Sequence, residues 1–160
     1  MANPTANDQR LSMVRVLHSF QISYADLAAT SGAGAKTLTL ATLSVGAIIE
    51  YIRVKSSVAF SGGALSALVL RVGKSGGVTD FFVKDFDIMQ AVYDGALVET
   101  FAPASGQLSA VTLAATLTPT GAACSVATAG VVNIDVLVTE VQTPATMPQY
   151  GSSTTKANVL

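Results

Sequence analysis

Short runs in which apolar and polar residues alternate follow one another along this chain of 160 residues, and glycine-rich turns separate them. Alternation with a period of two places successive side chains on opposite faces of a β-strand. No stretch has the length and period of a convincing helix. The alternation therefore predicts an all-β protein. The clearest runs are KTLTLATL (36–43), LSALVLRV (65–72), SAVTLAATLT (109–118) and VVNIDVLVTEV (131–141). On the last three runs the residues expected to share the inward face are Leu68, Leu70, Val72, Val111, Leu113, Ala115, Leu117, Val132, Ile134, Val136 and Val138. Those expected on the opposite face are Thr112, Ala114, Thr116, Asn133, Asp135 and Thr139.

The number and spacing of the runs narrow the choice of architecture. About eight strands are expected, separated by roughly 10–15 residues, which is typical of a β-sandwich or a barrel. Eight antiparallel strands in two sheets favour a jelly-roll-like sandwich. An immunoglobulin-like sandwich fits the same sequence pattern, so both remain open from the sequence alone.

Three segments carry more particular predictions. Residues 24–29 are expected to form one helical turn or to continue the strand before them. Residues 78–92 are expected to form an edge strand that leads into a loop or a short helix. Glu50 interrupts the apolar face of a long strand over 47–60, so we expect it near the end of that strand. The other residues expected on this face are Ile48, Ile52, Val54 and Val58.

The two ends of the chain lack the alternation. Residues 1–10 are polar and contain one Pro, and residues 143–160 are rich in Ser and Thr and contain two. The sequence therefore predicts one β-sandwich domain over 11–142 with an N-terminal arm (1–10) and a C-terminal arm (143–160). Arms of this composition are expected to be ordered only where something holds them, and neighbouring subunits are the simplest candidate.

Composition and charge argue against nucleic acid and membranes as binding partners. The formal net charge is -1 and 12% of the residues are charged, so we expect neither nucleic-acid nor membrane binding. No apolar run approaches the roughly 20 residues of a membrane-spanning helix. Residues 1–10 lack the apolar stretch of a secretory signal, which predicts synthesis in a host cytoplasm. An apolar fraction of 50% favours burial against other chains, and hence an oligomer.

The residues needed for catalysis are scarce. His18 is the chain's one histidine, and it lies in an alternating strand beside Ser19, where a structural role is the commoner one. Zinc requires three or four ligands, whereas the chain has one His and one Cys. Cys124 is expected to be a small buried apolar residue. We expect no enzyme activity, no catalytic residue and no cofactor.

Half of the ten acidic residues lie between Asp80 and Glu99. Calcium is bound by loops with several carboxylates, but no EF-hand spacing is present. A solvated acidic rim is therefore the preferred interpretation. The weak candidates for a metal site are Asp80, Asp85 and Asp87.

Basic side chains and the C-terminal arm supply the candidate interface. Three basic residues are expected on the outward faces of two adjacent strands. They could pair with the acidic stretch of a neighbouring copy, but ordinary solvated charge is the preferred interpretation. The candidate interface residues are Arg53, Lys55, Arg71, Pro144, Met147, Pro148 and Tyr150.

One stretch resembles a known group of proteins. Residues 19–63 read SFQISYADLAATSGAGAKTLTLATLSVGAIIEYIRVKSSVAFSGG, and this is similar to a family of small tailed-phage virion proteins. The likeness extends more weakly through 111–122 and 129–141. It implies a capsid-surface or head-associated protein, commonly trimeric, with no catalytic residues. The positions that carry the likeness are Phe20, Tyr24 to Leu27, Leu43, Gly46, Ala47, Ile49 and Ala59 to Gly63.

These observations favour a virion structural protein. The leading hypothesis is a capsid decoration or cement protein that binds the major capsid protein on the phage head and associates with copies of itself. A tail, fibre or baseplate component is the second hypothesis. The third, from a different class, is a carbohydrate-binding sandwich, for which the sequence offers Tyr51, Tyr93 and Tyr150 as aromatic platforms.

Overall fold

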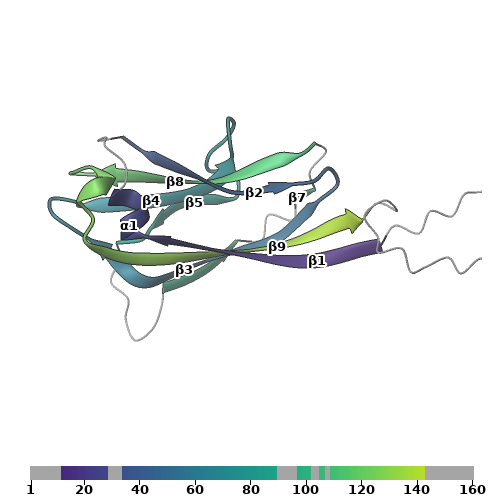
Figure 1. Ribbon diagram of the computed structural model, residues 1–160, viewed down its shortest axis with the longest axis horizontal. Helices are drawn as coiled ribbons and strands as arrows, with labels where there is room; N and C mark the ends of the chain where they lie inside the picture. The colour runs from purple at the N-terminus through teal and green to yellow at the C-terminus, as the bar shows by residue number, and fades with distance from the viewer. Residues whose placement is uncertain (1–11, 29–33, 90–96, 102–104, 107–108, 143–160) are drawn as a thin grey trace, which may run out of the picture.

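The computed structural model describes residues 12–28, 34–89, 97–101, 105–106 and 109–142, and within these ranges most residues belong to strands (Figure 1). Helix α1 (Tyr24–Ala28) follows the first strand, and a 3-10 turn, η1 (Cys124–Val126), precedes the last. The strands are β1 (Ser12–Ser23), β2 (Lys36–Leu43), β3 (Ile48–Ser61), β4 (Ala67–Lys74), β5 (Val83–Asp87), β6 (Leu97–Phe101), β7 (Ser105–Gly106), β8 (Val111–Thr120) and β9 (Ala129–Gln142).

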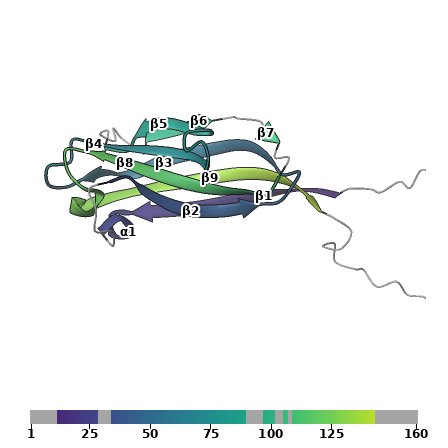
Figure 2. The same cartoon turned by 90° about the horizontal axis from the view of Figure 1, so that it is seen from above.

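The strands form two antiparallel layers whose strands run along the long axis of the molecule (Figure 2). One sheet has the order β1-β9-β3-β6, with the short β7 paired to β3. The other has the order β2-β8-β4-β5. The predicted edge strand in the 78–92 segment is confirmed, because β5 lies at the end of its sheet.

The pairing identifies the fold as a jelly roll. With the two-residue β7 left aside, the first of the eight longer strands pairs with the last, the second with the seventh, the third with the sixth and the fourth with the fifth. A long antiparallel hairpin rolled into two sheets produces this pairing. An immunoglobulin-like sandwich instead pairs its first two strands in one sheet. The predicted all-β, jelly-roll-like sandwich is confirmed, and the topology decides between the two alternatives.

Alternating side chains from both sheets fill the space between the layers. The inward residues of β4, β8 and β9 are the predicted ones, and each such Leu, Ile or Val stabilises the fold by roughly 1.5–3 kcal/mol. The residues with 0% exposure on these strands are Leu68, Leu70, Val72, Leu113, Ala115, Leu117, Val132, Ile134, Val136 and Val138. Cys124 is 1% exposed within the same core, as predicted.

Strand β3 departs from simple alternation. Its register against β9 shifts between Ile49 and Tyr51 and again between Ser56 and Val58. A bulge adds one residue to a strand and so reverses which residues point inward. The predicted buried face is therefore wrong at both ends, since Ile49 replaces the half-buried Ile48 in the core and Val58 is 48% exposed. Glu50 is the third residue of β3 and lies within the first bulge.

The segment after β1 forms a helical turn because hydrogen bonds between Ser23 and Asp26 cap its N-terminal end. The Asp26 carboxylate accepts hydrogen bonds from the Ser23 backbone N–H and from Ser23 Oγ, both at 2.8 Å, which is the acidic half of a capping box. These bonds also hold the pKa of Asp26 below its ordinary value. Leu27 is fully buried, so the helix closes one end of the core.

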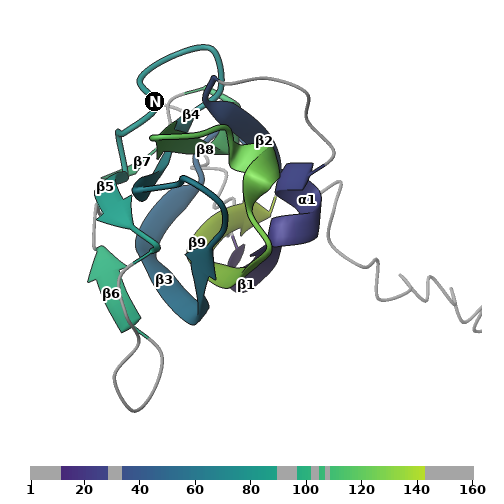
Figure 3. The same ribbon diagram turned by 90° about the vertical axis from the view of Figure 1, so that its left-hand side faces the viewer.

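The two sides of the sandwich differ. Seen from one end, α1 lies beside β1 and β2, whereas β5 and β6 lie on the opposite side (Figure 3). At the other end of the five-stranded sheet Ser12 is paired with Gln142. The segments before and after these two residues, which include the predicted arms, therefore begin side by side.

Candidate interaction surface

The outward side chains of β1, β9 and β3 form one face of the five-stranded sheet, which we call the outer face. Register sets these side chains in rows across the three strands. Directly opposed side chains in an antiparallel sheet lie close enough to interact. Along β1 the first of these rows contains Arg15 and Thr139, and the rows that follow are Leu17–Leu137–Tyr51, Ser19–Asp135–Arg53 and Gln21–Asn133–Lys55.

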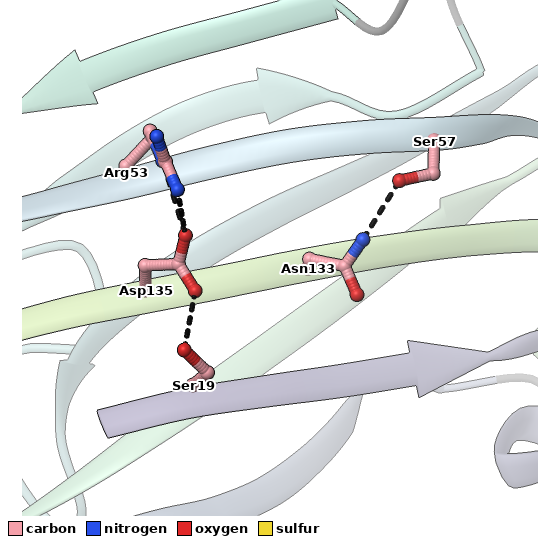
Figure 4. A network of polar contacts seen from close by, with 5 residues as sticks. All are labelled: Ser19, Arg53, Ser57, Asn133 and Asp135. Atoms are coloured by element: carbon pink, nitrogen blue, oxygen red, sulfur yellow. Dashed lines mark hydrogen bonds and ion pairs between the residues drawn. The ribbon is translucent and has the colours of Figure 1, made fainter. Parts of the chain in front are cut away.

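A polar network crosses the outer face from strand to strand (Figure 4). The Asp135 carboxylate accepts a hydrogen bond from Ser19 Oγ at 2.7 Å and another from Arg53 Nε at 3.0 Å. Burial raises the pKa of Asp135, but the hydrogen bonds from Arg53 and Ser19 outweigh it and hold the pKa below its ordinary value. In the next row Asn133 Nδ2 donates to Ser57 Oγ at 2.7 Å. These contacts connect all three strands.

A second ionic network lies two rows away, at the start of β3. Arg15 Nε donates to Glu50 Oε1 at 2.8 Å, and the Thr139 hydroxyl donates to the same carboxylate. The hydrogen bonds from Arg15 and then Thr139 lower the pKa of Glu50 to about 2. Thr139, predicted to face outward, does so, yet it is only 9% exposed in this arrangement.

An apolar row lies between the two networks. Leu17 is 52% exposed, and Leu137 and Tyr51 beside it are half-buried. Met13, four residues before Leu17 on the same face of β1, is 58% exposed. Exposed apolar side chains flanked by fixed polar ones are typical of protein interfaces. The outer face is therefore the candidate interaction surface of the described residues.

The structure separates the three predicted basic residues. Arg53 and Lys55 lie on the outer face of β3, but Arg71 lies on β4 in the other sheet, so the predicted adjacency of their strands is wrong. Arg71 Nε donates to Asp85 Oδ1 at 2.7 Å, and Arg53 is paired with Asp135. Hydrogen bonds within the chain thus engage both arginines, whereas Lys55 is exposed opposite Asn133. Their predicted interface role stays a prediction.

Asp80, Asp85 and Asp87, the candidate metal ligands, do not form a metal-binding group. Asp85 pairs with Arg71, and the Asp87 carboxylate accepts a hydrogen bond from the Met89 backbone N–H at 3.0 Å. Asp80 is half-buried in the loop before β5. No group of three or more His, Cys, Asp or Glu residues suited to a metal ion occurs in the part of the chain that the structure describes.

The other candidate residues are the single histidine, the tyrosines and the residues of the C-terminal arm. His18 lies on the inward face of β1, and its ring stacks near Phe20 with the ring centroids 6.3 Å apart. Tyr51 is half-buried in the apolar row. Five further candidates lie outside the described residues, namely Tyr93, Pro144, Met147, Pro148 and Tyr150.

Sequence reasoning missed part of the outer face. Leu17 and Leu137 were not singled out because either residue alone is an ordinary strand residue. Asp135 was expected to face outward, but its role depends on having Ser19 and Arg53 as cross-strand neighbours. The missing information is strand order, which no local pattern contains.

The fold has a counterpart of known structure. A chain of the cyanophage Pam1 capsid asymmetric unit matches with a TM-score of 0.52 and 15% identity, over 87% of this chain and 91% of that chain. A chain of infectious bursal disease virus, Gx strain, matches with a TM-score of 0.37 and 15% identity, over 85% of this chain and 33% of that one. The first match shows that the two chains share a fold.

Comparison at the level of sequence yields no relative. No family model matches the chain. No curated protein matches it either. Within the described ranges, none of the helices is long and apolar enough to span a membrane.

Proposed function

We propose that this chain is a non-enzymatic structural protein of a virus particle, and that it binds the outside of a phage head as a decoration or cement protein. The observation that carries the proposal is the fold shared with a chain of the cyanophage Pam1 capsid asymmetric unit, which extends over most of both chains. A virion role was also implied by the resemblance of residues 19–63 to small tailed-phage virion proteins.

The outer face supplies the attachment surface in this proposal. Its apolar row of Leu17, Leu137 and Tyr51 lies against the major capsid protein, and Lys55 adds a charge at the edge of the contact. Each contact is weak, but a trimer of this chain attaches through several contacts at once, which raises the overall affinity. The two arms extend the contact to neighbouring subunits and so bridge capsomers.

Labelling of particles tests this function. An antibody against the chain is applied to particles purified from a lysate in which the chain is made, and gold particles are located by electron microscopy. We expect many copies distributed over the head. Label confined to the tail would replace the decoration role by that of a tail, fibre or baseplate component. Particles without label, from a lysate that contains the free protein, would reject a virion role.

A further inference from the structure

A cavity of about 390 Å³ opens between the two sheets on the α1 side of the molecule. Residues 19–22 of β1 and residues 38–40 of β2 line it, and Asp26 of α1 lies at its border. Among the described strands β1 and β2 are the terminal members of their sheets on this side. The cavity is therefore a groove between two strand edges, which we call the edge groove.

The lining residues show that backbone faces the edge groove. Successive side chains of a strand point to opposite faces, so a wall made of four consecutive residues must be the edge of the strand itself. An edge strand directs alternate N–H and C=O groups away from its partner, where another chain can pair with them. Between the two edges lie Phe20, Leu38 and Leu40, which are half-buried and pack on the core.

Two strand edges with an apolar floor between them are suited to binding an extended polypeptide. Backbone groups along both edges bind another strand whatever its sequence, and an apolar floor accepts every second side chain. One end of the groove is held in place, because Lys36 Nζ donates a hydrogen bond to the Asp26 backbone carbonyl. Among the residues that line the groove Asp26 is the one that carries a charge, so a positive charge near the end of the occupant is favoured there beside Lys36.

We propose that the edge groove of one copy binds the 143–160 segment of a second copy, an inference that rests on the proposed function and specifies what the C-terminal arm binds. The segment begins after Gln142, opposite Ser12, about eight residues or roughly 27 Å along β1 from the groove. Its 18 residues reach about 60 Å when extended, enough to arrive at a neighbouring molecule.

The sequence of the 143–160 segment is suited to binding in the edge groove. Residues 149–160 contain no proline, so every backbone N–H is available for pairing. Lys156 is the one charged residue of the segment and complements Asp26.

Two prolines favour binding of the segment to the groove of a second copy over binding to the groove of its own chain. Pro144 and Pro148 bias the residues before them towards extended backbone and cannot donate to a continuing ladder. A return would require a reversal within this stretch and a crossing over the start of β1. Both points favour a second copy as the partner of the segment.

Disulfide trapping between two variants of the full chain, each with one introduced cysteine, tests the proposal. Thr39→Cys places a thiol on the exposed rim of the groove, and Ser152→Cys, Thr155→Cys and Ala157→Cys sample the segment. Lys84→Cys, exposed on the opposite edge strand β5, is the matched control. The native Cys124 is buried, and burial raises its pKa, so wild-type protein serves as the blank.

We expect mixtures of Thr39→Cys with at least one segment variant to give a covalent dimer at several times the yield of mixtures with Lys84→Cys. Equal yields, or no dimer, would overturn the proposal. A Thr39→Cys/Ala157→Cys double variant that closes within one chain, while the mixtures give no dimer, would also overturn it. Gold label on the head without any cross-link would reject the groove contact alone, whereas cross-links without head label would reject only the virion role.

Discussion

Gly130 lies so close to the ring of Phe60 that a Cβ added to Gly130 would be 2.3 Å from the ring Cγ. Phe60 is 1% exposed in the core, and its backbone N–H donates to the Ile88 carbonyl at 3.0 Å, so the ring has little room to move. Gly130 also has a φ of 136°, which side chains rarely adopt. Both the contact and the backbone conformation require glycine at this position.

Gly130→Ala should therefore lower the free energy of unfolding by about 3 kcal/mol, since the added methyl group both overpacks the core and strains the backbone. Chemical denaturation of the variant measures this change. Gly34→Ala is the matched control, because a Cβ there meets no atom within 4 Å. Equal stability of the two variants would show that the contact between Gly130 and Phe60 is not fixed.

Ser56→Ala should raise the free energy of unfolding by about 1 kcal/mol. Ser56 is 0% exposed, and its Oγ has no hydrogen-bond partner among the described residues, so folding removes it from water without compensation. The neighbouring Ser57 accepts an exposed hydrogen bond from Asn133, and Ser57→Ala should change stability by less than about 0.5 kcal/mol. A destabilised Ser56→Ala variant would reveal a hidden partner of the hydroxyl.

Thermal stability should fall as the pH drops from about 5 to about 2. The folded-state pKa of Glu50 is lowered from 4.5 to about 2 by Arg15 and Thr139, so the unfolded chain binds a proton that the folded chain does not. The stabilisation is complete above the unfolded pKa and is lost as the pH passes through the folded one. In Glu50→Gln the fall in Tm across this window should be smaller. An unchanged pH profile would rule out Glu50 as a contributor.

Leu17→Glu should reduce the amount of protein retained on particles without changing Tm, because it places a charge in the exposed apolar row. Val78→Glu provides a control with the same change at a residue that is 56% exposed in the loop between β4 and β5, away from the outer face. Retention is measured by sedimentation of particles mixed with each variant. Equal loss from both variants would place the contact elsewhere.

The period-two pattern predicted the inward faces of β4 and β9 correctly because each of these strands has one face in the core and no irregularity within that face. It failed on β3, where bulges reverse the alternation at both ends of the predicted face. On β8 the expected outward residues Ala114 and Thr116 are also buried, at 4% and 8% exposure. Thr116 faces Thr37 of β2, with a hydroxyl–hydroxyl distance of 3.2 Å, since β8 lies between two other strands.

The candidate site was less accessible to sequence reasoning. The wrong adjacency of Arg53 and Arg71 arose because β3 and β4, although they follow one another in the chain, belong to different sheets. The apolar row and the edge groove both depend on which strands are neighbours and which are edges. These are properties of the strand order, and a local pattern of residues does not encode them.

The pairing of Ser12 with Gln142 determines how the molecule carries a mechanical load. If the segments beyond these two residues are pulled towards different neighbours, the force acts across the end of the β1–β9 pair. Its hydrogen bonds then break one pair after another, as in a zipper, and not all together as in shear. Tension between subunits would therefore peel the domain open from this end, and resistance to it rests on the Met13–Val141 and Val14–Glu140 pairs that follow.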